Sequence, residues 1–204
     1  MSKLNFHSVL ANSYSTRDKQ KGAFKNEGYV FDSDLSNGNN SVYFNPKDKK
    51  ILMSVKGTNP FSLKDIGTDI YLAAGKLKDT DRYKESKNIL EKAKKRYNNA
   101  NATLASHSLG GSISQYKDDK VYTLDKGATI GTPTRGNETA YRSKGDVVSL
   151  LSSGNTRMTT LNRPSGIGMY RTIGLLAGGK TGGLVGNALD AHDIANVKNS
   201  NIMI

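Results

Sequence analysis

The chain has 204 residues, of which 35% are hydrophobic, and its 30 basic and 18 acidic residues give a formal net charge of +12 at pH 7. This length is sufficient for one domain with a substantial core. The sequence contains no cysteine, which excludes a disulfide framework, a thiolate nucleophile and a cysteine-ligated metal.

The apolar runs are too short and too broken to span a bilayer. The first residues, Met1 to His7, lack the long apolar core of a secretory signal. We therefore expect a soluble chain made without a removable Sec signal, and the sequence leaves its compartment open. The basic charge favours anionic partners, among them acidic lipid surfaces, nucleic acid or an acidic protein.

The first fifty residues are polar, and within them the segments 28–31 and 41–44 are short strand candidates. The run 51–55 is typical of a buried strand, and Lys56-Gly57-Thr58 ends it. In 83–97, apolar side chains recur every three or four residues, with lysines mostly around the other side. This pattern predicts a helix packed on a sheet with a solvated outer face, which we favour over a dedicated nucleic-acid helix.

Residues 102–106 form an apolar strand candidate that leads into His107-Ser108-Leu109-Gly110-Gly111, and a short helix is expected to end near Tyr116. A serine between small residues, after a strand and before a helix, is the pattern of a nucleophile elbow. The small residues are required because backbone from both sides of the turn approaches the serine closely. A helix that begins just after Ser108 directs free N–H groups at an oxyanion forming there.

The segments 121–124 and 127–130 form the next strand region, and 141–151 is interpreted as a strand ending in a loop that begins at Gly145-Asp146. Strands that alternate with helices predict an α/β fold with a mostly parallel sheet. The glycine-rich segment 164–187 is interpreted as a packed irregular surface segment, with a membrane-contacting loop as the alternative. We predict a single domain over residues 1–204, with 1–50 as a polar N-terminal region.

A serine nucleophile needs a base and an acid, and the chain has 3 histidines. His7 lies in the polar leader, and His107 adjoins Ser108 in a sharp turn, so His192 is the best base by elimination. Asp146, in a glycine-led turn, is the preferred acid, with Asp125 as runner-up because it falls within the preceding strand region. The order Ser108, Asp146, His192 is that of α/β-hydrolases.

The chain resembles the class 3 (fungal-type) lipases of the α/β-hydrolase fold. The landmarks occur in the family's order, over roughly residues 50 to 197: Lys56-Gly57-Thr58, Ser106-His107-Ser108-Leu109-Gly110-Gly111, Gly131-Thr132-Pro133, Asp146-Val147-Val148 and His192. Two positions depart from the family's pattern. Ser106 replaces the first glycine of the elbow, and Lys56 replaces an arginine, which removes a planar bidentate donor.

The resemblance implies that Ser108 attacks an ester carbonyl, His192 acts as general base and then general acid, and Asp146 orients His192. It implies an oxyanion hole from the backbone N–H groups of Leu109 and Thr58, and a lid over 59–74. The proposed lid carries apolar residues between polar ones: Phe61, Leu63, Ile66 and Ile70. Periodicity alone fits equally an amphipathic turn packed on the domain, and the position after Lys56-Gly57-Thr58 favours the lid.

These observations predict a serine esterase or lipase that hydrolyses carboxylic ester bonds of lipids, with triacylglycerol and phospholipid both open. We expect no metal and no organic cofactor. The partners expected are the lipid ester and, through the basic surface, an anionic membrane, whereas a nucleic acid is not expected. The alternative is a non-catalytic cationic protein on a lipase-like scaffold that binds a membrane, a nucleic acid or a larger particle. A peptidase or acyltransferase with the same triad stays open as a third interpretation.

Overall fold

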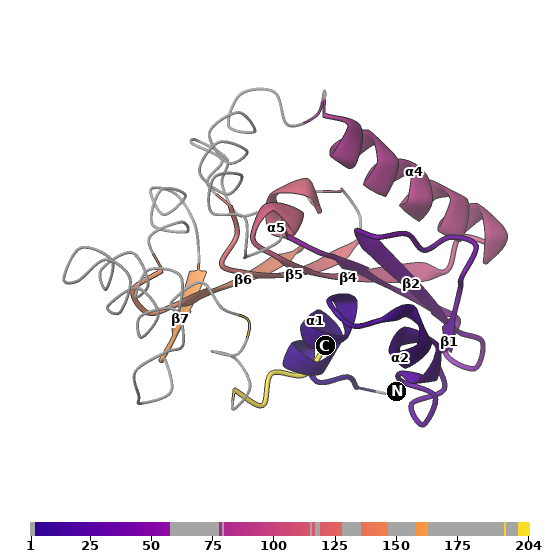
Figure 1. The fold of residues 1–204 in the computed structure, drawn as a ribbon, viewed down its shortest axis with the longest axis horizontal. Coiled ribbons are helices and arrows are strands. Elements are labelled where there is room, and N and C mark those ends of the chain that lie inside the picture. Colours follow the sequence, from indigo (N-terminus) through magenta and orange to yellow (C-terminus); the bar gives the residue numbers. More distant parts are fainter. Residues whose placement is uncertain are drawn as a thin grey trace.

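The computed structural model describes residues 3–57, 78, 80–114, 116, 119–127, 136–146, 158–162, 194 and 200–204. This part contains a 7-stranded sheet whose spatial order follows the sequence from β1 to β7 (Figure 1). The strands are β1 (Val30–Phe31), β2 (Asn40–Asn45), β3 (Lys50–Val55), β4 (Asn101–His107), β5 (Lys120–Leu124), β6 (Glu138–Ser143) and β7 (Met158–Leu161). β2 pairs antiparallel with both β1 and β3, and all pairs from β3 to β7 are parallel.

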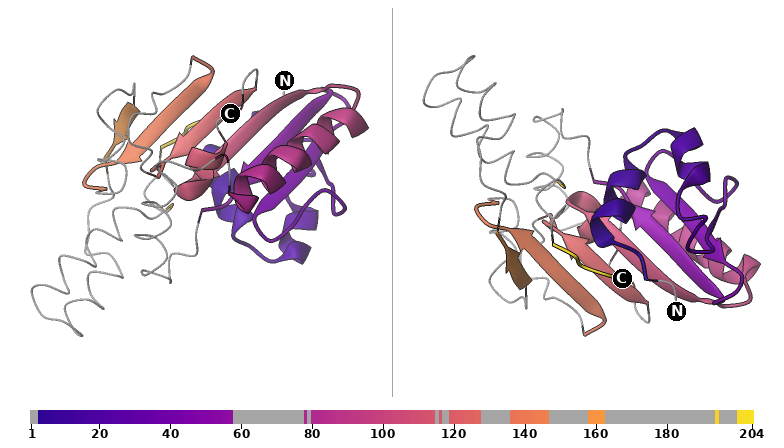
Figure 2. Two further views of the ribbon diagram at one scale, coloured as in Figure 1. Left: turned by 90° about the horizontal axis from the view of Figure 1, so that it is seen from above. Right: turned by 90° about the horizontal axis from the view of Figure 1, so that it is seen from below.

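Helices cover both faces of the sheet. α1 (Phe6–Ser13) and α2 (Arg17–Gly22) lie on one face, and α4 (Asp81–Arg96) and α5 (Leu109–Ile113) lie on the other (Figures 1 and 2). The predicted α/β class, with a mostly parallel sheet between helices, is therefore confirmed.

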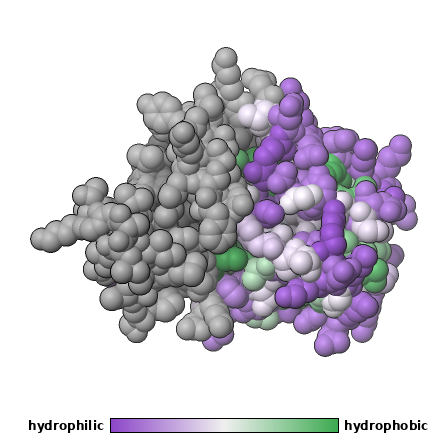
Figure 3. Space-filling view, in the orientation of Figure 1, coloured by the Kyte–Doolittle hydropathy of each residue, from purple (hydrophilic) through white to green (hydrophobic). Residues whose placement is uncertain are grey.

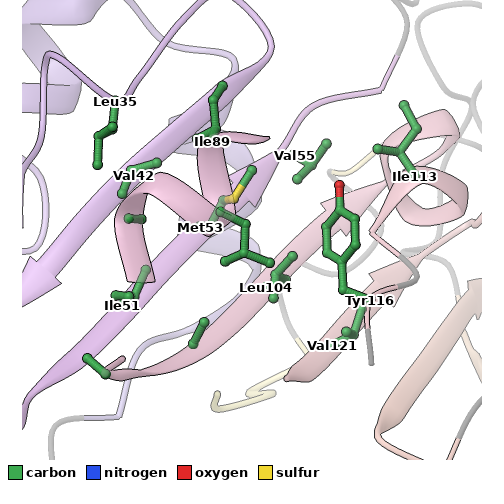
Figure 4. Packing of buried hydrophobic residues seen from close by; sticks show 14 of the residues in the cluster. Leu35, Val42, Ile51, Met53, Val55, Ile89, Leu104, Ile113, Tyr116 and Val121 are labelled. Carbon is green, nitrogen blue, oxygen red and sulfur yellow. The ribbon is translucent and has the colours of Figure 1, made fainter. Parts of the chain in front are cut away.

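Successive residues of the strands supply opposite sides of the sheet, as the pleat requires. In β3, Ile51, Met53 and Val55 belong to the core under α4 and α5, whereas Leu52 belongs to the core under α1. In the first of these cores, Ile89 of α4 and Ile113 of α5 pack over the strands (Figure 4). Because both faces are covered at β3, every residue from Ile51 to Val55 is buried, which explains why 51–55 is apolar apart from Ser54.

α4 confirms the helix predicted over 83–97, with bounds that differ by one or two residues. The Thr80 side chain accepts a hydrogen bond from the Tyr83 N–H and caps the helix start. Four residues at three- and four-residue spacing are buried on the sheet side: Ser86, Ile89, Leu90 and Ala93.

Several elements differ from their predicted bounds. β6 begins at Glu138 rather than Tyr141, α5 ends at Ile113 rather than near Tyr116, and Gly127 follows β5 without belonging to a strand. Just before β6, Asn137 is bound to the segment between α5 and β5, where its side-chain amide donates to the carbonyls of Tyr116 and Asp119, and the ladder with β5 starts at the next residue. α1 and α2 occupy part of the 1–50 region, where only strands were expected. The proposed lid 59–74 and the segment 164–187 lie outside the described residues.

The two ends of the described chain meet beside α1. Leu4 and Ile204 exchange backbone hydrogen bonds, and the Phe6 N–H donates to the Ile202 carbonyl. These contacts form an antiparallel bridge between Asn5 and Met203. Within the described ranges, no helix combines the length and apolar character needed to cross a membrane.

Candidate active site

The parallel pairing of β3 to β6 gathers four loop segments at one edge of the sheet. Each strand ends at this edge, so Gly57, Ser108, Asp125 and Asp146 follow the ends of successive strands. Ligands and reacting groups in α/β sheets bind at the carboxyl ends of the strands. The sequence-predicted serine and acid are therefore placed on the same edge.

Ser108 occupies a strained backbone conformation between β4 and α5. Its φ is 55° and its ψ is −128°, a region that non-glycine residues rarely adopt. Such a conformation costs on the order of 1–3 kcal/mol and persists only where the surroundings enforce it. The Ser108 N–H donates to the Leu124 carbonyl at 3.0 Å, and its carbonyl accepts from the Gly111 and Gly127 N–H groups at 2.9 and 3.0 Å.

The turn is possible because neighbouring residues lack side chains. A Cβ on Gly110 would lie 2.2 Å from the Val55 carbonyl oxygen, and a Cβ on Gly57 would lie 2.8 Å from the Ser108 Cβ. Both distances are shorter than real contacts, so glycine is required at each position. Ser106, which stands in place of the expected first glycine, is fully buried, and its hydroxyl donates to the Tyr122 carbonyl. The strand–turn–helix arrangement predicted for the elbow is thus observed.

The predicted oxyanion donors are described only in part. Leu109 is the first residue of α5, and the first N–H groups of a helix have no acceptor within it. Thr58 lies outside the described residues, and the adjoining Gly57 is the last one described before it. The Gly57 N–H donates to the Tyr14 hydroxyl at 3.0 Å.

Both candidate acids are buried at the edge of the sheet. Asp146 is 1% exposed, and its N–H donates to the Ser143 carbonyl in the turn after β6. Asp125 was expected inside a strand, but it is the first residue after β5, with a φ of 46°. Its carboxylate accepts the Ser143 N–H at 2.6 Å and the Ser143 hydroxyl at 2.7 Å. Asp125 thus binds the segment that leads to Asp146.

Two of the three histidines lie in the described part of the chain, and they differ in burial. His192 lies outside the described residues, although Ile194 packs against the core under α1. His7 is partly exposed on α1, and His107 is 5% exposed. The His107 Nδ1 lies 3.0 Å from the Tyr14 hydroxyl. The buried His107 thus contacts the end of α1 beside the turn at Ser108.

A buried ion pair lies beside the elbow, and the sequence analysis did not identify it. The Lys126 ammonium is 3.1 Å from the Glu138 carboxylate, and the two side chains are 1% and 2% exposed. Glu138 also accepts the Thr123 hydroxyl. A Cβ on Gly111 would lie 3.3 Å from the Lys126 backbone, so this pair supports the loop against which α5 rests. A buried lysine one residue after Asp125 gave no sequence signal, because lysines are usually solvated.

Tyr14 and Arg82 also bind the loop after β3, and the sequence did not indicate either of them. Tyr14 caps the end of α1, and Arg82 in α4 donates to the Lys56 carbonyl at 2.5 Å. Among the described residues, no group of histidine and carboxylate side chains has the arrangement of a metal site.

No family model matches the chain, and no curated protein matches it. Among solved structures, it is similar to the Lip2 lipase of Yarrowia lipolytica, with 16% identity and a TM-score of 0.38 over 66% of each chain. It is also similar to a Rhizomucor miehei lipase propeptide complex, with 16% identity, a TM-score of 0.42, and coverage of 73% of this chain and 62% of that one. A further fungal lipase gives 14% identity, a TM-score of 0.43 and coverage of 79% and 77%. The chain spans just under two thirds of the length of the first two lipases.

Proposed function

We propose that the chain is a serine esterase or lipase that hydrolyses carboxylic ester bonds of lipids through an acyl-enzyme on Ser108. The observation that carries this proposal is the backbone of Ser108, which stands at positive φ between a buried strand and a helix. A structural serine gains nothing from this strain. A nucleophile gains a position for its hydroxyl at the carboxyl edge of the sheet, close to the N–H groups at the start of the helix.

In the proposed reaction, the Ser108 hydroxyl attacks the ester carbonyl while His192 takes its proton. The resulting oxyanion accepts hydrogen bonds from the backbone N–H groups of Leu109 and Thr58. His192 then protonates the leaving alcohol, and water delivered by the same base hydrolyses the acyl-serine. Asp146 orients His192 and balances the charge of its imidazolium. In this proposal 59–74 is a lid that covers the site in water and turns its apolar residues to lipid.

The first test is hydrolysis of p-nitrophenyl esters together with labelling by a lipid-like fluorophosphonate. We expect a mass increase on the peptide that contains Ser108 and loss of both signals in Ser108→Ala. Ser114→Ala is a matched control, because this buried serine lies at the end of α5 and donates only within its own helix turn, to the Gly110 carbonyl. It should keep both signals. Hydrolysis that survives Ser108→Ala would contradict the mechanism.

The second test concerns the base. His192→Ala should lower kcat by several orders of magnitude, since the members of a triad act as a unit. Substitution of His107 should have the smaller effect. A nearly silent His192→Ala beside a more damaging His107→Ala would show that the base has been assigned to the wrong residue.

The net charge of +12 supports one competing function, a non-catalytic protein that binds an anionic surface. A chain that binds anionic vesicles but neither reacts with the fluorophosphonate nor hydrolyses esters would favour it. Amide, thioester and ester substrates, each with and without an alcohol acceptor, would separate a peptidase or acyltransferase from the esterase.

A further inference from the structure

The Tyr14 hydroxyl joins the two loops that would carry the acyl-transfer chemistry. It accepts the Gly57 N–H at 3.0 Å, and it lies 3.0 Å from the Nδ1 of His107. The Lys56 ammonium lies over the same ring, 5.4 Å from its centre. Tyr14 thus connects α1 with the end of β3 and with the residue just before Ser108.

These contacts lie where the loop after β3 packs directly against the turn at Ser108. A Cβ on Gly57 would lie 2.8 Å from the Ser108 Cβ and 3.1 Å from the Tyr14 hydroxyl oxygen, so the three groups are packed together. The Gly57 N–H is one peptide away from that of Thr58, the proposed oxyanion donor. A tilt of the peptide at Gly57 would therefore change the direction of the donor after it.

The neighbouring peptide is fixed from elsewhere. The Lys56 N–H donates to the Asn39 carbonyl at 2.9 Å, and the Lys56 carbonyl accepts from Arg82 in α4. α4 and α1 lie on opposite faces of the sheet (Figure 1). Arg82 therefore holds the loop from one face, and Tyr14 holds it from the other and also contacts the residue before the serine.

A phenolic oxygen has one proton and two lone pairs, and the Gly57 N–H occupies one of the lone pairs. The contact with His107 is then either donation from the hydroxyl to Nδ1 or donation from a protonated Nδ1 to the second lone pair, and the role proposed below takes the first of these. Donation to the Nδ1 of His107 requires that this nitrogen be unprotonated, so a neutral His107 carries its proton on Nε2. In this arrangement the hydrogen bonds from Gly57 to Tyr14 and from Tyr14 to His107 run in one direction and strengthen each other.

We propose that Tyr14 is a positioning residue for this site. Its hydroxyl accepts the Gly57 N–H and donates to the His107 Nδ1, and it thereby fixes the oxyanion-donating loop against the elbow. This role rests on the proposed acyl transfer at Ser108. In this role Tyr14 acts through Gly57 and His107.

The primary test compares Tyr14→Phe with Tyr43→Phe. Each change removes one tyrosine hydroxyl that joins α1 to the sheet by a hydrogen bond. In the control, the hydroxyl of Tyr43 in β2 accepts from the side chain of Asn12 in α1. Tyr43 lies in the middle of its strand, opposite Leu52, and far along β3 from Gly57. We expect Tyr14→Phe to lower kcat about 10- to 100-fold, the range for a displaced reactive geometry, with KM changed less than about twofold. Tyr43→Phe should keep kcat within about twofold.

A second pair of variants keeps the test decisive if Tyr14→Phe folds poorly. The amide oxygen of asparagine can occupy the place of the His107 Nδ1 and accept the Tyr14 hydroxyl proton, whereas leucine cannot. His107→Asn should therefore retain more kcat than His107→Leu. The double variant Tyr14→Phe/His107→Leu should be no slower than the worse single variant, because both changes remove the same hydrogen bond.

Imidazole ¹⁵N spectroscopy reads the hydrogen bond without using activity. His107 Nδ1 should resonate as an unprotonated, hydrogen-bonded nitrogen in the wild-type chain, and it should shift in Tyr14→Phe but not in Tyr43→Phe. A protonated Nδ1, or equal kcat values in an active wild type and a folded Tyr14→Phe, would overturn the role of Tyr14 and leave the proposed function standing. An inactive wild type whose Ser108 resists the fluorophosphonate would overturn the proposed function and this role with it.

Discussion

The strain at Ser108 has a measurable price in stability. The φ of 55° and ψ of −128° are accessible to glycine but unfavourable for any residue with a Cβ. At an ordinary backbone position glycine is the less stable choice, by roughly 0.5–1 kcal/mol relative to alanine. At position 108 glycine should instead be the more stable choice. The backbone strain that alanine would suffer there is larger than the extra conformational entropy that glycine loses on folding.

We therefore predict that Ser108→Gly is more stable than Ser108→Ala by about 1–2 kcal/mol, although both lose the hydroxyl. Urea unfolding of the two variants measures the difference. Ser106 supplies the matched pair, because it lies within β4 and its φ is not positive. There Ser106→Gly should be the less stable variant. The same order at both positions would argue against strain at the elbow.

The two buried aspartates at the carboxyl edge of the sheet, Asp146 and Asp125, should differ in what they control. Asp146→Asn should lower kcat by up to about 10⁴-fold with modest loss of stability, as expected for an acid that orients the base. Asp125 holds both polar groups of Ser143, so Asp125→Asn should mainly lower the free energy of unfolding, by about 1–3 kcal/mol. Ester hydrolysis and urea unfolding of both variants check this. The opposite pattern would make Asp125 the acid.

At the scale of the element, α4 is attached to the β1–β2 connection by a polar cluster. The Asp32 carboxylate is 2.9 Å from the Arg96 guanidinium and accepts the Tyr97 hydroxyl at 2.6 Å. Burial tends to raise the pKa of Asp32, but the Tyr97 hydroxyl, the Leu35 N–H and the Arg96 guanidinium together hold it below its ordinary value. Burial, followed by the neighbouring Asp32, raises the pKa of Tyr97 to about 12, so this hydroxyl stays protonated at neutral pH.

The sign of the pH dependence follows from the depressed pKa of Asp32. The stabilisation provided by the ionised Asp32 is fully present above the pKa of this group in the unfolded chain, about 4. It is lost as the pH falls through the lower pKa that Asp32 has in the folded chain. Asp32→Asn should cost about 1–2 kcal/mol at pH 7, a value reduced by the partial exposure of Arg96, and this difference should shrink towards pH 2. Asp34→Asn is the matched control, because Asp34 also faces Arg96 but its side chain is 75% exposed. Urea unfolding across this pH range should show little change for it.

The N-terminal helices show which elements a sequence can reveal. α1 carries a detectable signal, since Asn5 caps it and Phe6, Val9 and Leu10 share one face. α2 has no such signal, because Arg17–Gly22 contains no large apolar residue. It is stabilised instead by Gln20, whose buried amide donates to the carbonyls of Asn12, Ser13 and Ser15. Contacts of this kind exist only after the chain has folded, so periodicity cannot predict them.

The residues of the candidate site also divide into those that the sequence can predict and those that it cannot. The elbow was predictable because its local demands, small residues and a strand–helix junction, are written in consecutive positions. Tyr14 and Lys126 were not, because each reaches the site from a separate element and each has an ordinary sequence context. The placement of Asp125 was wrong for a simpler reason: the segments 121–124 and 127–130 together resemble one strand region, whereas β5 ends at Leu124 and Gly127 belongs to no strand.

At the scale of the whole molecule, the surplus of positive charge should control the approach to a lipid surface. In the view of Figure 3, the described part of the surface is mostly hydrophilic, with small hydrophobic areas. The exposed side of α4 contributes four lysines to the described surface: Lys84, Lys87, Lys92 and Lys95. Electrostatic attraction to an anionic bilayer is therefore the expected first contact.

We predict that binding and turnover are higher on vesicles of equal parts phosphatidylglycerol and phosphatidylcholine than on phosphatidylcholine alone. The advantage should fall at least about tenfold between about 0.05 and 0.5 M KCl, because salt shortens the range of the attraction. Vesicle sedimentation measures the binding. Hydrolysis of a short soluble ester is the control, since its rate should show little salt effect. Equal binding and turnover on both vesicles at low salt would remove the anionic interface from the proposal.

The bridge between Asn5 and Met203 has a consequence for the order of folding. The strands of the sheet are neighbours in sequence as well as in space, so each can join the growing sheet by closing a comparatively short loop. The bridge instead closes almost the whole chain, which carries the largest entropic cost of the described contacts. We therefore expect α1 to dock last. Because Tyr14 ends that helix, the loops at the carboxyl edge of the sheet would reach their final alignment only in the closing step of folding, and refolded chains should regain their sheet before the proposed activity.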